Sequence, residues 1–311
     1  DPGRMARLPD TRGLRNQVIM VRSQRNFYDH AIRAAGATIV EVGLPDRYAG
    51  AGVRDAEVWE IEDAITPDTA AIFYVADAQS QPPLRDVAGV AKKHSIPVIV
   101  DAAAQLPPQS NLTRFIAEGA DLVAFSGGKA LGGPQASGIL CGRKDLVMSA
   151  ALQHLDLDIY ADMWNPPSSL IDKRKLKGTP QHGIGRSCKA GKEEIAGLLT
   201  ALRLFIAEGD AARHTRWMAI LNAVISSAKG MSKASAAIEG SGDMGAVPSL
   251  VISCHGKPDT ADRIIKKLIA GNPSIHTDPF WRHQNRIVIN PLCIRPDQTA
   301  AIGKALGKLL S

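Results

Sequence analysis

Short apolar runs alternate with amphipathic segments through the first half of the chain. After a polar, turn-rich start (1–16), the runs predict strands at 18–21, 38–42, 70–75, 96–100, 122–125 and 138–141. Helical patterns lie between them at 28–35, 57–65, 84–94 and 111–118, and residues 43–54 form a glycine-rich connection. This alternation is typical of an α/β fold with a doubly wound, mostly parallel sheet.

The second half of the chain follows a different pattern. Residues 156–182 lack periodicity and carry a basic run at 172–177, which indicates a solvated loop or a mobile flap near a site. A long amphipathic helix is expected at 189–208 and another helix from 210 to 229. Beyond them, strands (247–254, 274–278, 286–290) alternate with helices (259–270, 298–310). We therefore predict a large domain over 1–188, and a bridging helix with a small α+β domain over 189–311.

Composition narrows the class of protein without fixing its function. The 311 residues are 45% hydrophobic and 22% charged, as in ordinary globular proteins, and no apolar run has the length of a membrane span. The net charge of +6 permits an anionic substrate or RNA, but the basic residues are spread along the chain. Cys141, Cys188, Cys254 and Cys293 are far apart and show no CxxC spacing, which favours a reduced, cytoplasmic protein without a metal site.

Candidate chemistry gathers at the ends of two predicted strands. Asp101 follows the run 96–100, and Ser126-Gly-Gly-Lys129 follows the run 122–125. In an α/β sheet, ligands bind beyond the carboxyl ends of the strands, so these residues are expected at one edge. Burial would lower the pKa of a lysine there and free its amine for a Schiff base, although a surface lysine in a glycine loop is the simpler alternative. A lysine for the aldehyde and a carboxylate for the ring nitrogen are what pyridoxal phosphate requires.

Three stretches of the chain carry a family resemblance: 97–108, 119–135 and 183–194. They resemble the fold-type-I pyridoxal-phosphate enzymes, and within these the group related to bacterial selenocysteine synthase, the seryl-tRNA selenium transferase. A weaker similarity runs from Arg25 to the C-terminus. The resemblance implies pyridoxal 5'-phosphate as cofactor and a homo-oligomer built on dimers. Aminosugar-acid ammonia-lyases belong to the same group of enzymes.

The resemblance also implies roles for individual residues. Lys129 would form the Schiff base, and Asp101 would face the ring nitrogen unless it serves only as a helix cap. The Ser126 hydroxyl and the amides of Gly127 and Gly128 would bind a phosphate oxygen, although Ser126 is also a common turn residue.

Three further positions concern the cofactor and the substrate. Gln105 is a candidate for the cofactor's phenolic oxygen, or else an amide in water. Arg186, between a glycine turn and a helix, suits bidentate binding of a substrate carboxylate or phosphate, with a domain-interface ion pair as the alternative. Relatives often have a ring-stacking histidine before the Arg25-Asn26 pair, where this chain has Gln24. The chain also begins on what resembles the segment after the first helix, so the N-terminal arm and first phosphate turn are expected to be missing.

The functional hypothesis is an elimination or replacement reaction on a small anionic amino acid or aminosugar acid. A first alternative is seryl-tRNA selenium transfer, although no separate tRNA-binding domain is seen ahead of the sheet. A second is a non-catalytic subunit that keeps the pyridoxal-phosphate fold. A nicotinamide-binding Rossmann domain is excluded, because no predicted strand is followed by Gly-x-Gly-x-x-Gly. Exposed apolar surface on the 189–208 helix and around Tyr160, Met163 and Trp164 supports the prediction of an oligomer.

Overall fold

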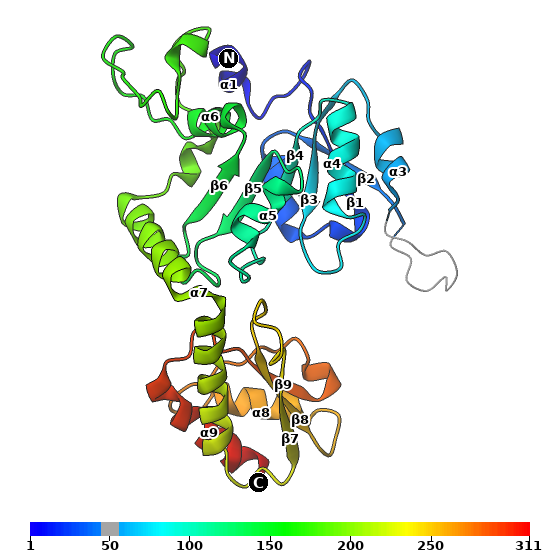
Figure 1. Cartoon of the computed structure of the whole chain (residues 1–311), viewed down its shortest axis with the longest axis vertical. Helices are drawn as coiled ribbons and strands as arrows, with labels where there is room; N and C mark the ends of the chain where they lie inside the picture. Colours follow the sequence, from blue (N-terminus) through cyan, green and yellow to red (C-terminus); the bar gives the residue numbers. More distant parts are fainter. Residues whose placement is uncertain (45–55) are drawn as a thin grey trace. The chain divides into compact units, whose positions relative to one another are not determined.

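The structure, a computed structural model, describes residues 1–44 and 56–311. It divides into two compact units, drawn in Figure 1: Asp1–Gln105 with Ser110–Ala201, and Leu106–Gln109 with Leu202–Ser311. Most of the predicted connection at 43–54 lies outside the described residues. The two units divide at 201/202, inside helix α7 (Lys192–Ser227), whereas the sequence placed a domain boundary at 188/189. The domain assignment stays a prediction.

A mostly parallel sheet forms the centre of the first unit. Its strands are β1 (Gln17–Val21), β2 (Thr38–Val42), β3 (Thr69–Val75), β4 (Val98–Asp101), β5 (Leu122–Ser126) and β6 (Gly138–Gly142). Within the described residues the strand order is β2-β1-β3-β4-β5-β6; the first five strands are parallel, and β6 is antiparallel to β5. The predicted fold class is confirmed.

Apolar strands between amphipathic helices explain this arrangement. Ile19, Val98, Val100 and Val123 are fully buried, as expected for strands covered on both faces. The helices of this part are α2 (His30–Ala34), α3 (Val58–Asp63), α4 (Leu84–Lys93) and α5 (Asn111–Ala117). In Figure 1, α4 and α5 lie on the same face of the sheet.

Two helices that the sequence pattern did not indicate pack together beside the sheet. Helix α1 (Pro2–Arg7) lies in the stretch expected to be turn-rich, and α6 (Lys144–Gln153) follows β6. Met5 of α1 and Leu152 of α6 form a small buried cluster with Ile171. The Asp1 carboxylate accepts a hydrogen bond from the Gly3 amide and caps α1. The segment 156–182 is therefore anchored at Ile171 and is more than a solvated loop.

The second unit joins most of α7 to a small antiparallel sheet. Its strands β7 (Ala234–Glu239), β8 (Ser249–Cys254) and β9 (Arg286–Ile289) lie in that order, packed with α8 (Thr260–Ile269) and α9 (Thr299–Leu310) around a core of aliphatic side chains. Strand β7 was not predicted. The predicted strand at 274–278 is wrong, since the only bridge in that range joins Asp278 to Val288. Pro273 precedes it, and the Ser274 hydroxyl bonds back to the Ile269 carbonyl.

The structure also describes the state of the cysteine thiols and the character of the helices. All four cysteines lie in the described part of the chain and are free. Burial raises the pKa of the Cys141 and Cys254 thiols, which makes both poor nucleophiles. Among the described helices, none combines the length and apolar character needed to cross a membrane.

Candidate active site

Asp101 and the loop of Lys129 leave the sheet at the same edge. Strands β4 and β5 are parallel neighbours, and Asp101 is in register with Ala124, two residues before the end of β5. Both strands therefore end at the carboxyl edge, where α/β folds place their ligands. The structure brings Asp101, Ser126 and the start of the Lys129 loop together as the sequence predicted.

Asp101 is held by the turn that follows β4. Its Oδ1 accepts a hydrogen bond from the Ala103 amide at 2.9 Å, and its backbone carbonyl accepts one from the Ala76 amide at 2.9 Å. The next helix, α5, has Ser110 as its N-cap, so Asp101 does not cap it. Asp101 is half-buried.

Lys129 lies on a closed loop, residues 127–137, that joins β5 to β6. The Gly127 amide donates to the Ser137 carbonyl at 2.9 Å, and the Gly127 carbonyl accepts from the Gly133 amide at 2.8 Å. The Gly127 amide is therefore engaged, and the predicted phosphate contact rests on the Ser126 hydroxyl and the Gly128 amide. Lys129 itself is exposed. The burial assumed for this lysine is wrong for the single chain, because its side chain comes from a turn beyond the strand end.

The glycines of this loop fit close backbone packing and leave no room for side chains. A Cβ on Gly127 would lie 2.1 Å from the Ser137 Oγ, and one on Gly128 would lie 2.7 Å from the Gln135 Cα. The loop thus presents an amine and backbone at the edge where Asp101 presents a carboxylate. These donor types fit pyridoxal phosphate, which needs an amine for its aldehyde, an acid for its ring nitrogen and donors for its phosphate.

Two glutamines lie at or near this edge. Gln24 is 6% exposed; its Oε1 accepts from the Val75 amide at 2.9 Å, and Val75 pairs with Asp101 in the neighbouring strand. The sequence showed only that a histidine was missing at this position, whereas the structure shows that Gln24, in the 3-10 turn after β1, bonds to the end of β3. Gln105 lies in the loop after β4, where its carbonyl accepts from the Asn111 Nδ2 at 2.6 Å. Its side chain is half-buried.

Arg186 lies on a short 3-10 helix (Ile184–Cys188) beside the end of α6. Its guanidinium bonds the Asp156 carboxylate, and this bond holds the pKa of Asp156 below its ordinary value. Lys189 Nζ lies 3.7 Å from the same carboxylate. The structure gives Arg186 an acidic partner within its own unit and no described contact with Asp101 or Lys129. Its role in substrate binding stays a prediction.

A trio of possible metal ligands lies in the same place. Asp156, Asp158 and His182 are, within residues 1–44 and 56–311, the group whose ligand atoms all lie within 4.8 Å of one another. His182 Nε2 lies 3.6 Å from Asp156 and 3.5 Å from Asp158. Arg186 and Lys189 already neutralise Asp156, so the trio has weak attraction for a cation and we assign no metal to it.

A mostly parallel α/β sheet with an acid and a lysine loop at adjacent strand ends defines the fold-type-I pyridoxal-phosphate enzymes. The family model for L-seryl-tRNA selenium transferase (SelA) matches residues 28–159. The 5'-C-glycyluridine monooxygenase-decarboxylase of a Streptomyces species is 30% identical over 320 residues, covering 99% of this chain and 70% of that protein. The chain belongs to the SelA-like family of pyridoxal-phosphate enzymes, and its cofactor is pyridoxal 5'-phosphate.

This chain is similar to one lyase both in sequence and in structure. The D-glucosaminate-6-phosphate ammonia lyase of Salmonella typhimurium is 33% identical over 210 residues, covering 65% of this chain and 46% of that protein. A solved structure of D-glucosaminate-6-phosphate ammonia-lyase has a TM-score of 0.75 at 27% identity, covering all of this chain and 75% of that one. The sequence alignment thus spans less than half of the curated lyase, whereas the structural match covers three quarters of the solved one.

Proposed function

We propose that this enzyme catalyses an elimination or replacement on a small anionic amino compound, such as an aminosugar acid. The observation that carries the proposal is the pairing of β4 with β5, which puts Asp101 and the Lys129 loop at one edge of the sheet. The similarity to D-glucosaminate-6-phosphate ammonia lyase supports the substrate class. The net charge of +6 favours an anion over a cation.

The roles of the residues follow from their chemistry. When bound, pyridoxal 5'-phosphate supplies an electron sink for the charge left at the substrate's α carbon. Asp101 would keep the ring nitrogen protonated. Lys129 Nζ would hold the cofactor covalently and, once the substrate's amine had taken its place, would be free to take or return the α proton. The Ser126 hydroxyl and Gly128 amide would bind the phosphate, and Gln105 would bind the phenolic oxygen.

Arg186 would bind the substrate's carboxylate or phosphate, in its own subunit's site or in its neighbour's. Its side chain is 44% exposed, and its guanidinium is already paired with Asp156. An incoming anion would therefore have to compete with that carboxylate. The competing possibility is that the Arg186–Asp156 pair only fixes the 3-10 helix against the end of α6.

Borohydride trapping tests the proposal directly. Reduction of the purified protein with its cofactor should leave a pyridoxyl adduct on Lys129, identified by peptide mass mapping. Lys129→Ala should lose the adduct and turnover while it keeps the melting temperature, because Lys129 is exposed. Lys192→Ala is the matched control and should keep both. An adduct on another lysine, or none in the cofactor-loaded protein, would leave the non-catalytic subunit as the better hypothesis.

The SelA match at 28–159 favours one second candidate, seryl-tRNA selenium transfer. Binding of tRNA through backbone phosphates would weaken steeply with salt. An electrophoretic shift with tRNA at two salt concentrations therefore separates this activity from a reaction on a free amino acid. The small-molecule proposal predicts no salt-dependent shift at micromolar protein.

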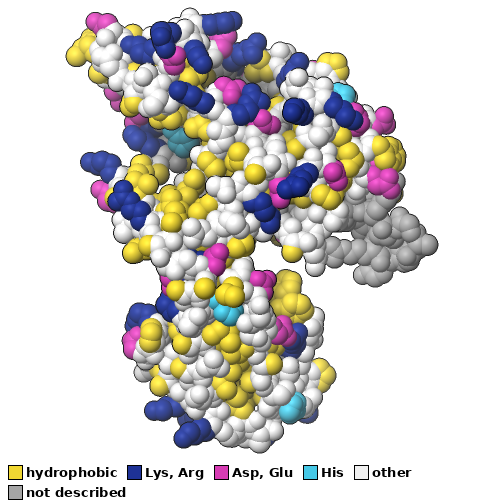
Figure 2. All heavy atoms as spheres, viewed as in Figure 1, with side chains coloured by type: hydrophobic (Ala, Val, Ile, Leu, Met, Phe, Trp, Pro, Cys, Tyr) yellow, Lys and Arg dark blue, Asp and Glu magenta, His cyan; other side chains and the backbone are white. Residues whose placement is uncertain are grey.

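We also propose a homo-oligomer built on two-fold dimers in the reducing cytoplasm, in keeping with the free cysteines. Figure 2 shows hydrophobic side chains gathered over β6 and the first turns of α7. Leu140, Ile195 and Leu199 on these two elements are 42%, 50% and 48% exposed. Light scattering at several concentrations tests the assembly, and Leu199→Glu should reduce it.

A further inference from the structure

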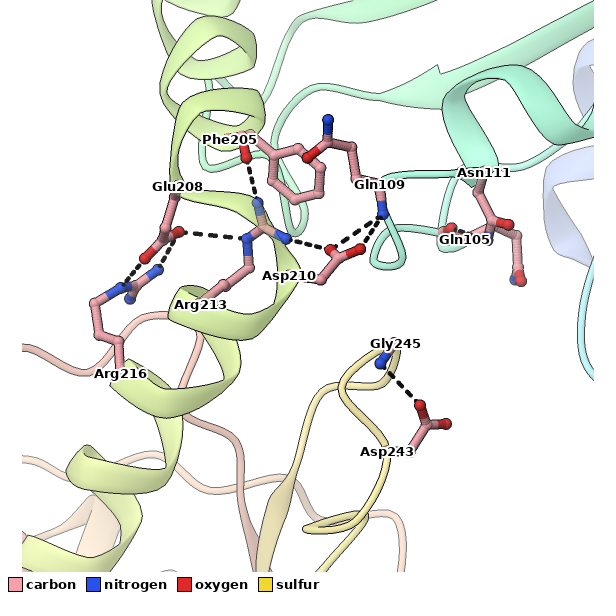
Figure 3. A network of polar contacts seen from close by, with 10 residues as sticks. All are labelled: Gln105, Gln109, Asn111, Phe205, Glu208, Asp210, Arg213, Arg216, Asp243 and Gly245. Atoms are coloured by element: carbon pink, nitrogen blue, oxygen red, sulfur yellow. Dashed lines mark hydrogen bonds and ion pairs between the residues drawn. The ribbon is translucent and has the colours of Figure 1, made fainter.

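Arg213 is a fully buried cation in the second unit. Its side chain is 1% exposed, and it follows Gly209, where α7 departs from helical geometry with φ of +70°. The guanidinium donates to Asp210 Oδ1 at 2.7 Å, lies 3.3 Å from Glu208 Oε2, and stacks 3.5 Å from the centre of the Phe205 ring (Figure 3). It also donates to the Phe205 carbonyl. A buried charge persists only with such complete pairing.

The break at Gly209 gathers both acids on this one arginine. Glu208 and Asp210 are two residues apart, and on a regular helix such residues do not share a face. Among the described residues, no atom outside its own stretch of helix lies within 4 Å of a Cβ built on Gly209, so the glycine serves the left-handed backbone angle and not close packing. Both carboxylates therefore reach Arg213 because the helix is interrupted between them.

Asp210 also binds the backbone of a distant segment, at Gln109. Its two carboxylate oxygens accept from the Gln109 amide at 3.1 and 2.9 Å (Figure 3). Leu106–Gln109 belongs to the second unit, although the chain before and after it belongs to the first. The buried Arg213 fixes the Asp210 carboxylate, and Asp210 fixes the backbone of Gln109.

The segment held in this way is continuous with the candidate site. It begins at Asp101, passes through Gln105 and ends at Asn111. In the first unit the Ala102 amide donates to the Ala124 carbonyl at 2.9 Å, and Asn111 Nδ2 donates to the Gln105 carbonyl at 2.6 Å. Hydrogen bonds thus hold Ala102 and Gln105 within the first unit, and Gln109 within the second unit.

We infer that Asp210 and Arg213 are positioning residues, which hold the 102–110 loop so that Asp101 and Gln105 keep their places at the site. The inference rests on the proposed function for its catalytic consequence, but not for the anchoring of the loop. The two consequences can be measured separately, one by the loop's hydrogen exchange and one by the behaviour of the cofactor.

Hydrogen exchange of the intact protein tests the anchoring. In Asp210→Ala, the Gln109 amide loses its acceptor, so amide exchange in a peptide covering 102–110 should quicken about 10-fold or more. A peptide covering 111–126 should not change. Arg216→Ala is the matched control: Arg216 shares Glu208 with Arg213, is 50% exposed, and makes its described contacts with Glu208 and Trp217. If Asp210→Ala does not fold, Asp210→Asn takes its place, with a smaller increase expected.

The cofactor provides the second measurement. In the loaded enzyme, Asp210→Ala should lower kcat more than it raises KM, and should change the pH dependence of the cofactor's absorbance, while Arg216→Ala leaves both as in the wild type. Unchanged exchange in 102–110 in a folded variant would overturn the anchoring. Faster exchange with wild-type kcat and absorbance would overturn the positioning role. A wild-type protein without cofactor signal would refute the proposed function and leave the exchange result to stand by itself.

Discussion

Gly127→Ala is the sharpest single test of how the lysine loop is built. The added methyl group would lie 2.1 Å from the Ser137 Oγ, 2.9 Å from the Ser137 carbonyl oxygen and 2.9 Å from a Leu198 methyl carbon. Gly127 cannot move away, because both of its backbone groups are hydrogen-bonded within the loop. Its amide donates to the Ser137 carbonyl at 2.9 Å, and its carbonyl accepts from the Gly133 amide at 2.8 Å. Ser137 has to shift, and it holds the Pro134 carbonyl through its hydroxyl at 2.6 Å.

The expected cost has two parts. Overpacking by one methyl group costs about 1–3 kcal/mol. Loss of one hydrogen bond of the loop costs about 0.5–1.5 kcal/mol more. We therefore expect a loss of about 2–4 kcal/mol in the free energy of unfolding of the first unit, which lowers its melting temperature by roughly 5–15 °C. Displacing Lys129 by about 1 Å should also lower turnover by about 100-fold.

Thermal unfolding followed by calorimetry, together with cofactor content, measures both effects. Gly89→Ala is the matched control: Gly89 lies within α4, and in the described part of the chain no atom outside its own stretch of helix lies within 4 Å of the added Cβ, so the change should stabilise by about 0.5–1 kcal/mol. Gly127→Ala with Ser137→Ala removes the closest clash and should recover part of the loss. A Gly127→Ala protein with wild-type melting temperature and cofactor content would show that the loop is not closed as described.

Three further changes have defined outcomes. Asp101→Asn removes the charge proposed for the ring nitrogen and should lower kcat roughly 100-fold or more with cofactor still bound; near-normal turnover would assign that role to another group. Arg186→Ala should raise KM for an anionic substrate about 10-fold if Arg186 binds it, whereas an unchanged KM with smaller species in light scattering would identify an interface pair. Hydrogen bonds from Arg25 and Arg33 lower the pKa of Asp29, so the stability it contributes is complete above pH ~4 and is lost as the pH falls toward its folded-state pKa. The unfolding free energy of Asp29→Asn should therefore fall less steeply than that of the wild type as the pH is lowered below ~4. The same fall in both proteins would contradict the pairing of Asp29 with Arg25 and Arg33.

The parallel sheet, and the edge of it that carries Asp101 and the Lys129 loop, were predictable because they depend on local sequence patterns. A run of four or five apolar residues followed by Asp101, and another followed by Ser126-Gly-Gly-Lys129, gives both the strands and their ends. Parallel pairing of consecutive strands then places both ends together.

Other elements depend on contacts between distant residues. Helix α1 has six residues and relies on Met5 packing against Leu152 and Ile171, about which the sequence near Met5 says nothing. Strand β7 is Ala-Ser-Ala-Ala-Ile-Glu, with weak alternation, and it forms by pairing with β8. Arg213 looks like an ordinary surface arginine of an amphipathic helix until the break at Gly209 brings Glu208 and Asp210 onto it.

The exposure of Lys129 links the site to the proposed assembly. The sequence argument for a reactive amine assumed burial, but the lysine is open to water in one chain. Desolvation strengthens electrostatic interactions in a site only when something covers it. Exposed apolar side chains on β6 and the start of α7 belong to the same unit as the lysine loop, and β6 follows that loop directly. A second copy packed over these elements would bury apolar surface and cover the edge that carries Lys129, so assembly and activity should be lost together in Leu199→Glu.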